Sequence, residues 1–172
     1  VKRDLQGAPC DLALLFVAET YENFHPAAFA KNLDHLSDAE KACLELDPHK
    51  EVSGPVASCI HGIGHGIASY YLTTDLQSSL RTCTKLTHGS EYCFDGVFME
   101  FVRNAPDTFF HKDDLLYPCN QFENDEAYAI ACGRNQPSLL LDRFKLSIDE
   151  VVTACKSSAS EPFKEACFDA VG

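Results

Sequence analysis

The sequence contains no Cys-x-x-Cys motif, although it contains nine cysteines. Zinc knuckles, thioredoxin-type redox sites and c-type haem attachment sites are therefore excluded, because each needs that spacing. A phosphate-binding loop is missing as well, since the Gly62-x-Gly64 sequence follows no strand pattern. No order of Ser, His and Asp, or of Cys and His, indicates a nucleophilic enzyme.

Long apolar runs are absent and basic residues are few. The longest uncharged apolar stretch, Leu12 to Ala18, is far too short to cross a bilayer, so no membrane insertion is expected. Lysine and arginine number 14 against 26 acidic residues, which gives a net charge of −12. This charge disfavours nucleic acid and anionic membranes as partners, and it suits cations or basic partners.

Sustained alternation of apolar and polar residues, the pattern of a half-buried strand, is also missing. Helix signals take its place. Capping boxes begin at Ser37, Thr74 and Ser147, each a short distance before a cysteine. Breakers such as Pro48 and Gly89 then precede a second cysteine, which indicates pairs of helices joined by a turn.

Eight of the cysteines form four pairs that recur at a nearly constant period. The first members are 40, 36 and 36 residues apart, and the second members are 34, 39 and 35 residues apart. Periods of this size are typical of stacked supersecondary units. The predicted disulfides are Cys43–Cys59, Cys83–Cys93, Cys119–Cys132 and Cys155–Cys167.

These patterns predict an all-α fold. Antiparallel helices pack 8–10 Å apart, within reach of two cysteine side chains, so each unit is a helical hairpin joined by one disulfide. We expect an α-solenoid-like array of about four such hairpins as one domain over residues 37–172. Residues 1–36, with helices over about 11–24 and 26–36, are expected to form an N-terminal helical cap.

Regular disulfides indicate an oxidising compartment, so the protein is expected to be secreted, extracellular or periplasmic. No signal-peptide pattern is present, and under this interpretation the chain is the mature product. Cys10 has no partner by period. It is either an interchain bridge, the partner of a cysteine outside this sequence, a ligand, or a buried free thiol.

A short motif around the first cysteine pair resembles a known family. Lys41-Ala-Cys43-Leu44, followed by Ser58-Cys59 and a glycine-bearing helix, is similar to the disulfide-linked Sel1-like repeats of secreted cysteine-rich bacterial proteins. Those are α/α-hairpin repeats related to tetratricopeptide repeats. The resemblance covers about residues 37–172, and it implies a helical-repeat architecture and a role in binding.

The first repeat departs from the others at His61, where the second and fourth carry Asp95 and Asp169. His61 and His65 lie one turn apart on the same helix face, the arrangement with which two imidazoles bind one metal ion. Glycines between and beside them each lower helix stability by about 0.8–1 kcal/mol relative to alanine. Close packing is expected to offset this cost, because Gly62 and Gly66 let a second helix or a flat cofactor approach the backbone.

A third ligand is expected from the second repeat. Aligning Cys59 with Cys93 places Asp95 opposite His61 and Glu100 close to the position of His65. The predicted metal site is therefore His61, His65 and Glu100, a ligand set that suits zinc, iron or copper, with haem as an alternative. His88 is a candidate fourth ligand. Whether such a site is catalytic stays open, since no general base stands out.

Two other interpretations stay open. The histidines and glycines could serve packing alone, with His61 and His65 bonded to neighbouring loops. The protein would then be an interaction scaffold that binds a protein partner on the concave surface of its repeats. Alternatively, Cys10 could link copies of the chain into a self-assembling structural subunit.

Overall fold

The computed structural model describes residues 35–49 and 51–172, and all regular structure within these ranges is helical. The predicted all-α class is confirmed for them. The N-terminal cap and Cys10 lie outside the described residues, apart from the last two positions of the cap. The helices are α3 (Leu36–Leu44), α4 (Gly54–Tyr70), α5 (Leu76–Cys83), α6 (Ser90–Asn104), α7 (Glu126–Ser138), α8 (Ile148–Ser157) and α9 (Glu161–Val171).

Three short helical segments complete these ranges. Two 3-10 turns span Asp107–Phe109 (η1) and Cys119–Phe122 (η2), and a π-helical segment, η3 (Leu139–Arg143), directly continues α7. None of the helices in the described residues is long and apolar enough to cross a membrane.

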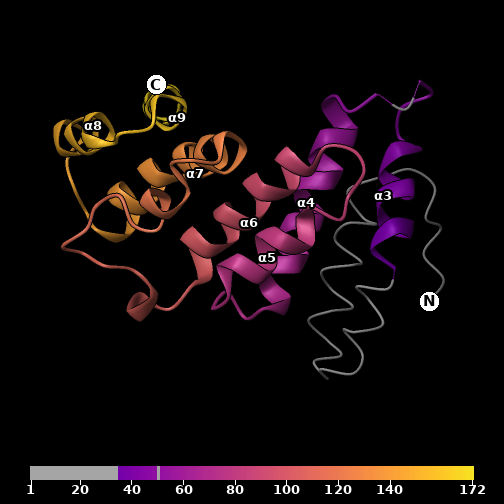
Figure 1. Ribbon diagram of the computed structural model, residues 1–172, viewed down its shortest axis with the longest axis horizontal. Helices are drawn as coiled ribbons and strands as arrows, with labels where there is room; N and C mark the ends of the chain where they lie inside the picture. The colour runs from indigo at the N-terminus through magenta and orange to yellow at the C-terminus, as the bar shows by residue number, and fades with distance from the viewer. Residues whose placement is uncertain (1–34, 50) are drawn as a thin grey trace, which may run out of the picture.

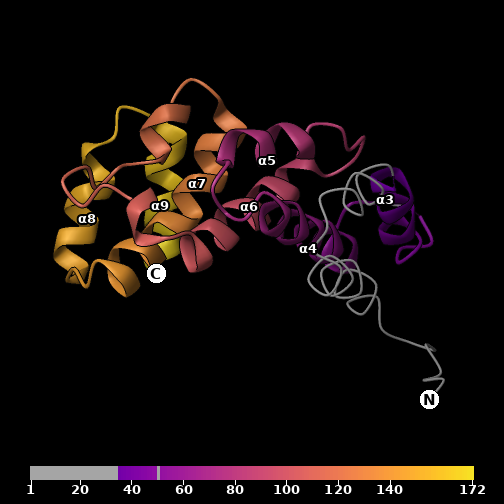
Figure 2. The same cartoon turned by 90° about the horizontal axis from the view of Figure 1, so that it is seen from below.

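The helices are spread along the long axis of the molecule, from α3 at one end to α8 and α9 at the other (Figure 1). Helix α4 packs on α6, α6 packs on α7, and α7 packs on α9, so these four helices form the continuous centre of the structure. The shorter helices flank them: α3 packs on α4, α5 on α4 and α6, and α8 on α9 (Figure 2).

Four disulfides tie the flanking elements to the central helices. Each joins a cysteine of α3, α5, η2 or α8 to the next central helix, with Cα atoms 5.5–5.9 Å apart. The bonds are Cys43–Cys59, Cys83–Cys93, Cys119–Cys132 and Cys155–Cys167, the pairs that the cysteine spacing predicts. Closing loops of this length contributes about 2–3 kcal/mol each in the chain-entropy model.

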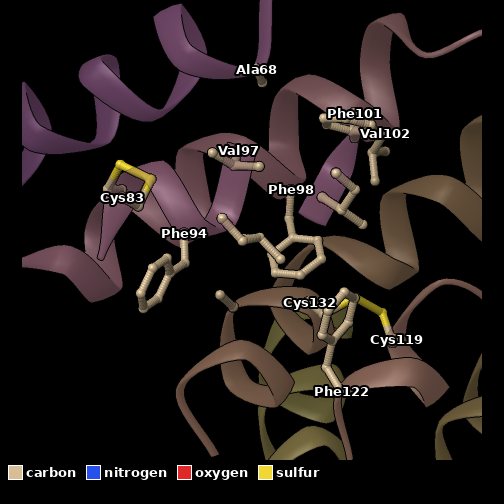
Figure 3. Packing of buried hydrophobic residues seen from close by; sticks show 14 of the residues in the cluster. Ala68, Cys83, Phe94, Val97, Phe98, Phe101, Val102, Cys119, Phe122 and Cys132 are labelled. Atoms are coloured by element: carbon tan, nitrogen blue, oxygen red, sulfur yellow. A yellow bond between two sulfur atoms is a disulfide. The ribbon is translucent and has the colours of Figure 1, made fainter. Parts of the chain in front are cut away.

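Helix α6 supplies much of the core. Its buried residues Phe94, Val97, Phe98 and Phe101 recur at helical spacing, and three of them are at most 2% exposed. Phe98 points toward Phe122, with ring centroids 5.7 Å apart, beside the Cys119–Cys132 bond (Figure 3). Neighbours on three sides bury α6, because α4, α5 and α7 all pack on it.

Of the three predicted capping boxes, the structure confirms the one at Ser147, where Ser147 and Glu150 satisfy each other's backbone amides. The other two are wrong. Asp75 rather than Thr74 caps α5, because its carboxylate accepts from the Ser78 amide. Ser37 lies inside α3, which begins one residue earlier.

The glutamate of the predicted Ser37 box makes a long-range contact instead. Glu40 is 5% exposed, and one carboxylate oxygen accepts from the backbone amides of Thr87 and His88 and from the Thr87 hydroxyl, all at 2.7–2.8 Å. It thereby holds α3 against the turn that precedes α6. Burial raises the pKa of Glu40, but the hydrogen bonds from Thr87 and His88 outweigh it and leave the pKa below its usual value.

Helices α4 and α6 touch through two glycines. A Cβ atom added to Gly64 would lie 2.2 Å from the carbonyl oxygen of Cys93, and one added to Gly96 would lie 2.0 Å from that of His61. The sequence predicts a close approach at Gly62 and Gly66, whereas the approach seen here is at Gly64. Gly64 lies one turn after the fully buried Ile60, on the face of α4 that packs on α6.

We predict that Gly96→Ala destabilises the fold by about 1–3 kcal/mol, because the new methyl group forces two helix backbones apart. Without this close contact, alanine would stabilise the helix by about 0.5–1 kcal/mol relative to glycine. A loss of stability in Gly96→Ala would therefore show that the two helices are in close contact at this position. Urea unfolding followed by circular dichroism measures it. Ser58→Ala, at an exposed position of α4, is the control and should change the midpoint little. An unchanged or raised midpoint for Gly96→Ala would contradict the close packing.

We also predict that Glu40 makes stability depend on pH. The pKa of Glu40 is lower in the folded protein than in the unfolded chain, where it has its usual value of 4.5. The ionised carboxylate therefore stabilises the fold above pH 4.5, and this stabilisation is lost as pH falls through the folded-state pKa. Glu40→Gln should therefore lower stability at pH 7 and flatten the decline below about pH 4.5. Thermal unfolding between neutral and acidic pH tests this, with Glu91→Gln as the exposed control. Equal slopes for parent and Glu40→Gln would exclude this role.

Candidate metal centre

His61 and His65 project from adjacent turns of α4 on its side facing α6. Their Nε2 atoms are 3.1 Å apart, and the two rings meet at an interplanar angle of 61° with centroids 4.9 Å apart. The helix explains the pairing, because residues four apart share a face. The structure therefore brings the two predicted imidazole ligands together through the same nitrogen of each ring.

The other nitrogen of each ring contacts a carboxylate of α6. His61 Nδ1 lies 3.1 Å from Asp95 Oδ2, and His65 Nδ1 lies 2.7 Å from Glu100 Oε2. The four side chains thus form an unbroken sequence of contacts, Asp95–His61–His65–Glu100, which we call the histidine-pair site. Their side chains are 15–22% exposed, so the site is largely covered yet reachable from solvent.

Three further residues fix the two carboxylates. Asn135 on α7 donates to Asp95 Oδ1 at 2.9 Å, while Asn104 and Ser69 donate to Glu100 Oε1 at 2.6 and 3.2 Å. Burial raises the pKa of Glu100, but the hydrogen bonds from His65, Asn104 and Ser69 outweigh it and lower the pKa overall. Glu100 is therefore ionised at neutral pH.

Sequence reasoning missed these three supporting residues. Two had a usable signal, since Ser69 lies one helical turn after His65 and Asn104 lies one turn after Glu100. Asn135 had none. It belongs to the repeat whose motif after the cysteine, Cys132-Gly-Arg-Asn135, is the most degenerate, and only the packing of α7 on α6 brings it to Asp95.

The hydrogen bonds of the histidine-pair site depend on the tautomers of its two rings. Two neutral imidazoles supply one hydrogen each, which is enough for the two hydrogen bonds, Nε2–Nε2 and His65 Nδ1–Glu100, while His61 Nδ1 and Asp95 form an ion-pair contact. If both Nδ1 atoms donate to their carboxylates, two Nε2 lone pairs face each other across 3.1 Å. That arrangement is repulsive unless a cation lies between or beside them, and the cation is either a third proton or a metal ion.

The nitrogen spacing fits one shared metal ion. With zinc–nitrogen bonds of about 2.0–2.1 Å, tetrahedral ligands would lie about 3.3–3.4 Å apart and adjacent square-planar ligands about 2.9 Å apart. The observed 3.1 Å lies between these values. A linear two-coordinate ion would need about 4 Å, so that geometry does not fit.

The remaining predicted ligands occupy other positions. Glu100 contacts Nδ1 of His65, on the far side of the ring from Nε2, where it orients the imidazole. His88 contacts Glu40 near the start of α6. Within residues 35–49 and 51–172, no group of three or more His, Cys, Asp or Glu side chains converges on a common metal position. The site is therefore built on two histidines.

Comparisons with known proteins add no relative. No family model matches the chain, and searches of curated proteins and of solved structures likewise found no match. The resemblance to Sel1-like repeats therefore stays a prediction, and the function must be inferred from the geometry of the histidine-pair site.

Proposed function

We propose that this protein binds one divalent transition-metal ion, zinc or copper(II), through the Nε2 atoms of His61 and His65. The observation that carries the proposal is the 3.1 Å spacing of these atoms while both Nδ1 atoms contact carboxylates. Nitrogen ligands bind Cu²⁺ and Zn²⁺ more tightly than Fe²⁺, which favours these two among the expected metals.

Asp95 and Glu100 act as the orienting carboxylates of the two ligands. A carboxylate on Nδ1 fixes the proton there, leaves the Nε2 lone pair free for the metal, and raises the basicity of the ring. The two negative charges also balance a divalent ion. A net charge of −12 on the whole chain further favours the approach of cations.

Two protein ligands leave coordination positions open. Structural zinc sites are closed by four protein ligands, so the proposed centre belongs to a different class, in which water or a donor atom from another molecule completes the shell. Both carboxylates of the site are already engaged. We therefore propose metal binding, or metal-dependent binding of another molecule, rather than a hydrolytic reaction.

The disulfides support the wider setting of this proposal. Four buried disulfides favour an oxidising compartment, so we propose a secreted, extracellular or periplasmic protein. We also propose that its disulfide-linked units form a solenoid-like array of the Sel1 or tetratricopeptide kind. The metal centre would then lie where α4 packs on α6, with His61 at the position that Asp95 and Asp169 hold in two other units.

We predict that His61→Ala and His65→Ala each abolish stoichiometric binding of zinc or copper. Untagged protein, loaded and then dialysed, is analysed by inductively coupled plasma mass spectrometry, and circular dichroism confirms the fold. His49→Ala, an exposed histidine outside the site, should bind as the parent does. A parent without stoichiometric metal, or a His49 variant that loses it equally, would refute the proposal and leave a scaffold role.

We predict that Asp95→Asn and Glu100→Gln each weaken metal affinity about 10–100-fold without abolishing it, as expected for carboxylates that orient the ligands. Competition with a chromogenic chelator gives the dissociation constants. Complete loss in Glu100→Gln, equal to that in His65→Ala, would instead make Glu100 a direct ligand.

Metal binding should also release protons. Because both imidazoles must be neutral to bind the ion, affinity should fall as pH drops through the ordinary histidine range near 6.5. Calorimetric titration in two buffers of different ionisation enthalpy measures the protons released per ion. No release at pH 6, together with a pH-independent affinity, would show that the metal binds elsewhere.

A further inference from the structure

A groove runs between the turn at residues 113–116 and α8, on the opposite end of the molecule from α3 (Figure 1). Its volume is about 550 Å³, within the range of pockets that hold a compact ligand. None of its lining residues belongs to the histidine-pair site. It is therefore a feature that the proposed metal binding does not use.

The floor of the groove is apolar. Leu115 and Leu116 from the turn, Leu146 from the segment before α8, and Ala154 from α8 line it. The three leucines are only partly buried, so they offer apolar surface that the other described residues leave uncovered. Next to the lining residue Asp149, Ile148 is 60% exposed, one of two large apolar side chains so exposed in the described part of the chain.

The rim of the groove is acidic. Asp113, Asp114, Asp149 and Glu150 line it, and no lysine or arginine does. Asp114 accepts from the Leu116 amide and the Asn120 side chain, and Glu150 belongs to the Ser147 capping box. By contrast, the side chains of Asp113 and Asp149 have no hydrogen bond or ion pair within the described ranges, so two carboxylates remain for a partner.

We propose that this groove, which we call the α8 groove, docks a basic amphipathic segment of a partner protein. Apolar side chains of the segment would lie on Leu115, Leu116 and Leu146, and flanking lysines or arginines would pair with Asp113 and Asp149. Helix-in-groove recognition joins these elements in this way. The apolar floor supplies most of the affinity, while the exposed carboxylates speed association and select against acidic segments.

The charge of the whole chain directs the choice of occupant. At −12 the protein repels acidic partners, including a second copy of itself, and attracts basic ones. A simple inorganic cation would not need the leucine floor, and a neutral apolar peptide would not need the unpaired carboxylates. A segment with both apolar and basic side chains complements both features of the groove.

The test uses a fluorescein-labelled synthetic helix of leucine and lysine with one apolar face, and its counterpart with glutamate in place of lysine. Anisotropy should show saturable binding of the lysine peptide and none of the glutamate peptide. Asp113→Asn combined with Asp149→Asn should weaken binding at least about tenfold at low salt, as expected for loss of charge complementarity. Glu45→Gln combined with Glu91→Gln changes the net charge equally at exposed positions, one directly after α3 and one on α6, and should leave binding close to that of the parent.

A second variant tests the apolar floor. Thr153 is exposed on α8 and lines the groove, so Thr153→Trp fills it without disturbing the core. At high salt, where ion pairs contribute little, the parent should still bind the peptide through the apolar floor, and Thr153→Trp should abolish this binding. The proposal is overturned if the lysine peptide does not bind the parent, if both double variants weaken binding equally, or if Thr153→Trp binds as the parent does.

Discussion

The contact between α4 and α6 at Gly64 and Gly96 determines where every chemical group of the histidine-pair site lies. Each glycine meets a backbone carbonyl of the opposite helix at a distance that a side chain would forbid. The helix backbones therefore approach closely enough for Asp95 and Glu100 to reach the outer nitrogens of two rings on α4. A wider separation of the two helices would move both carboxylates away from the histidines that they contact.

The electrostatics of the site follow from this packing. Two carboxylates fixed by Asn135, Asn104 and Ser69 place negative charge beside the two imidazoles. A proton or a divalent ion at the Nε2 atoms balances that charge, and competition between the two makes any metal binding sensitive to pH.

The disulfides separate the stability of the fold from this chemistry. Short helices such as α3 and α8 bury little apolar surface of their own, and a bond to the neighbouring central helix holds each in place. Removing a metal ion or a histidine therefore need not unfold the protein. This separation lets α4 accept three glycines within five positions, a density that would weaken an isolated helix.

Local sequence determined the features that depend on neighbours along the chain. These are the helical class, the four cysteine pairs, the capping box at Ser147 and the shared face of His61 and His65, because helical periodicity and short loops fix them. The packing of distant helices determined the long-range contacts. Glu100 contacts Nδ1 of His65, and Asn135 on α7 donates to Asp95 on α6. Glu40 accepts from the Thr87 amide in the turn before α6, and not from the start of its own helix. Such contacts join residues 35 to 47 positions apart, and the crossing of two helices that creates them depends on side-chain packing that no local pattern encodes.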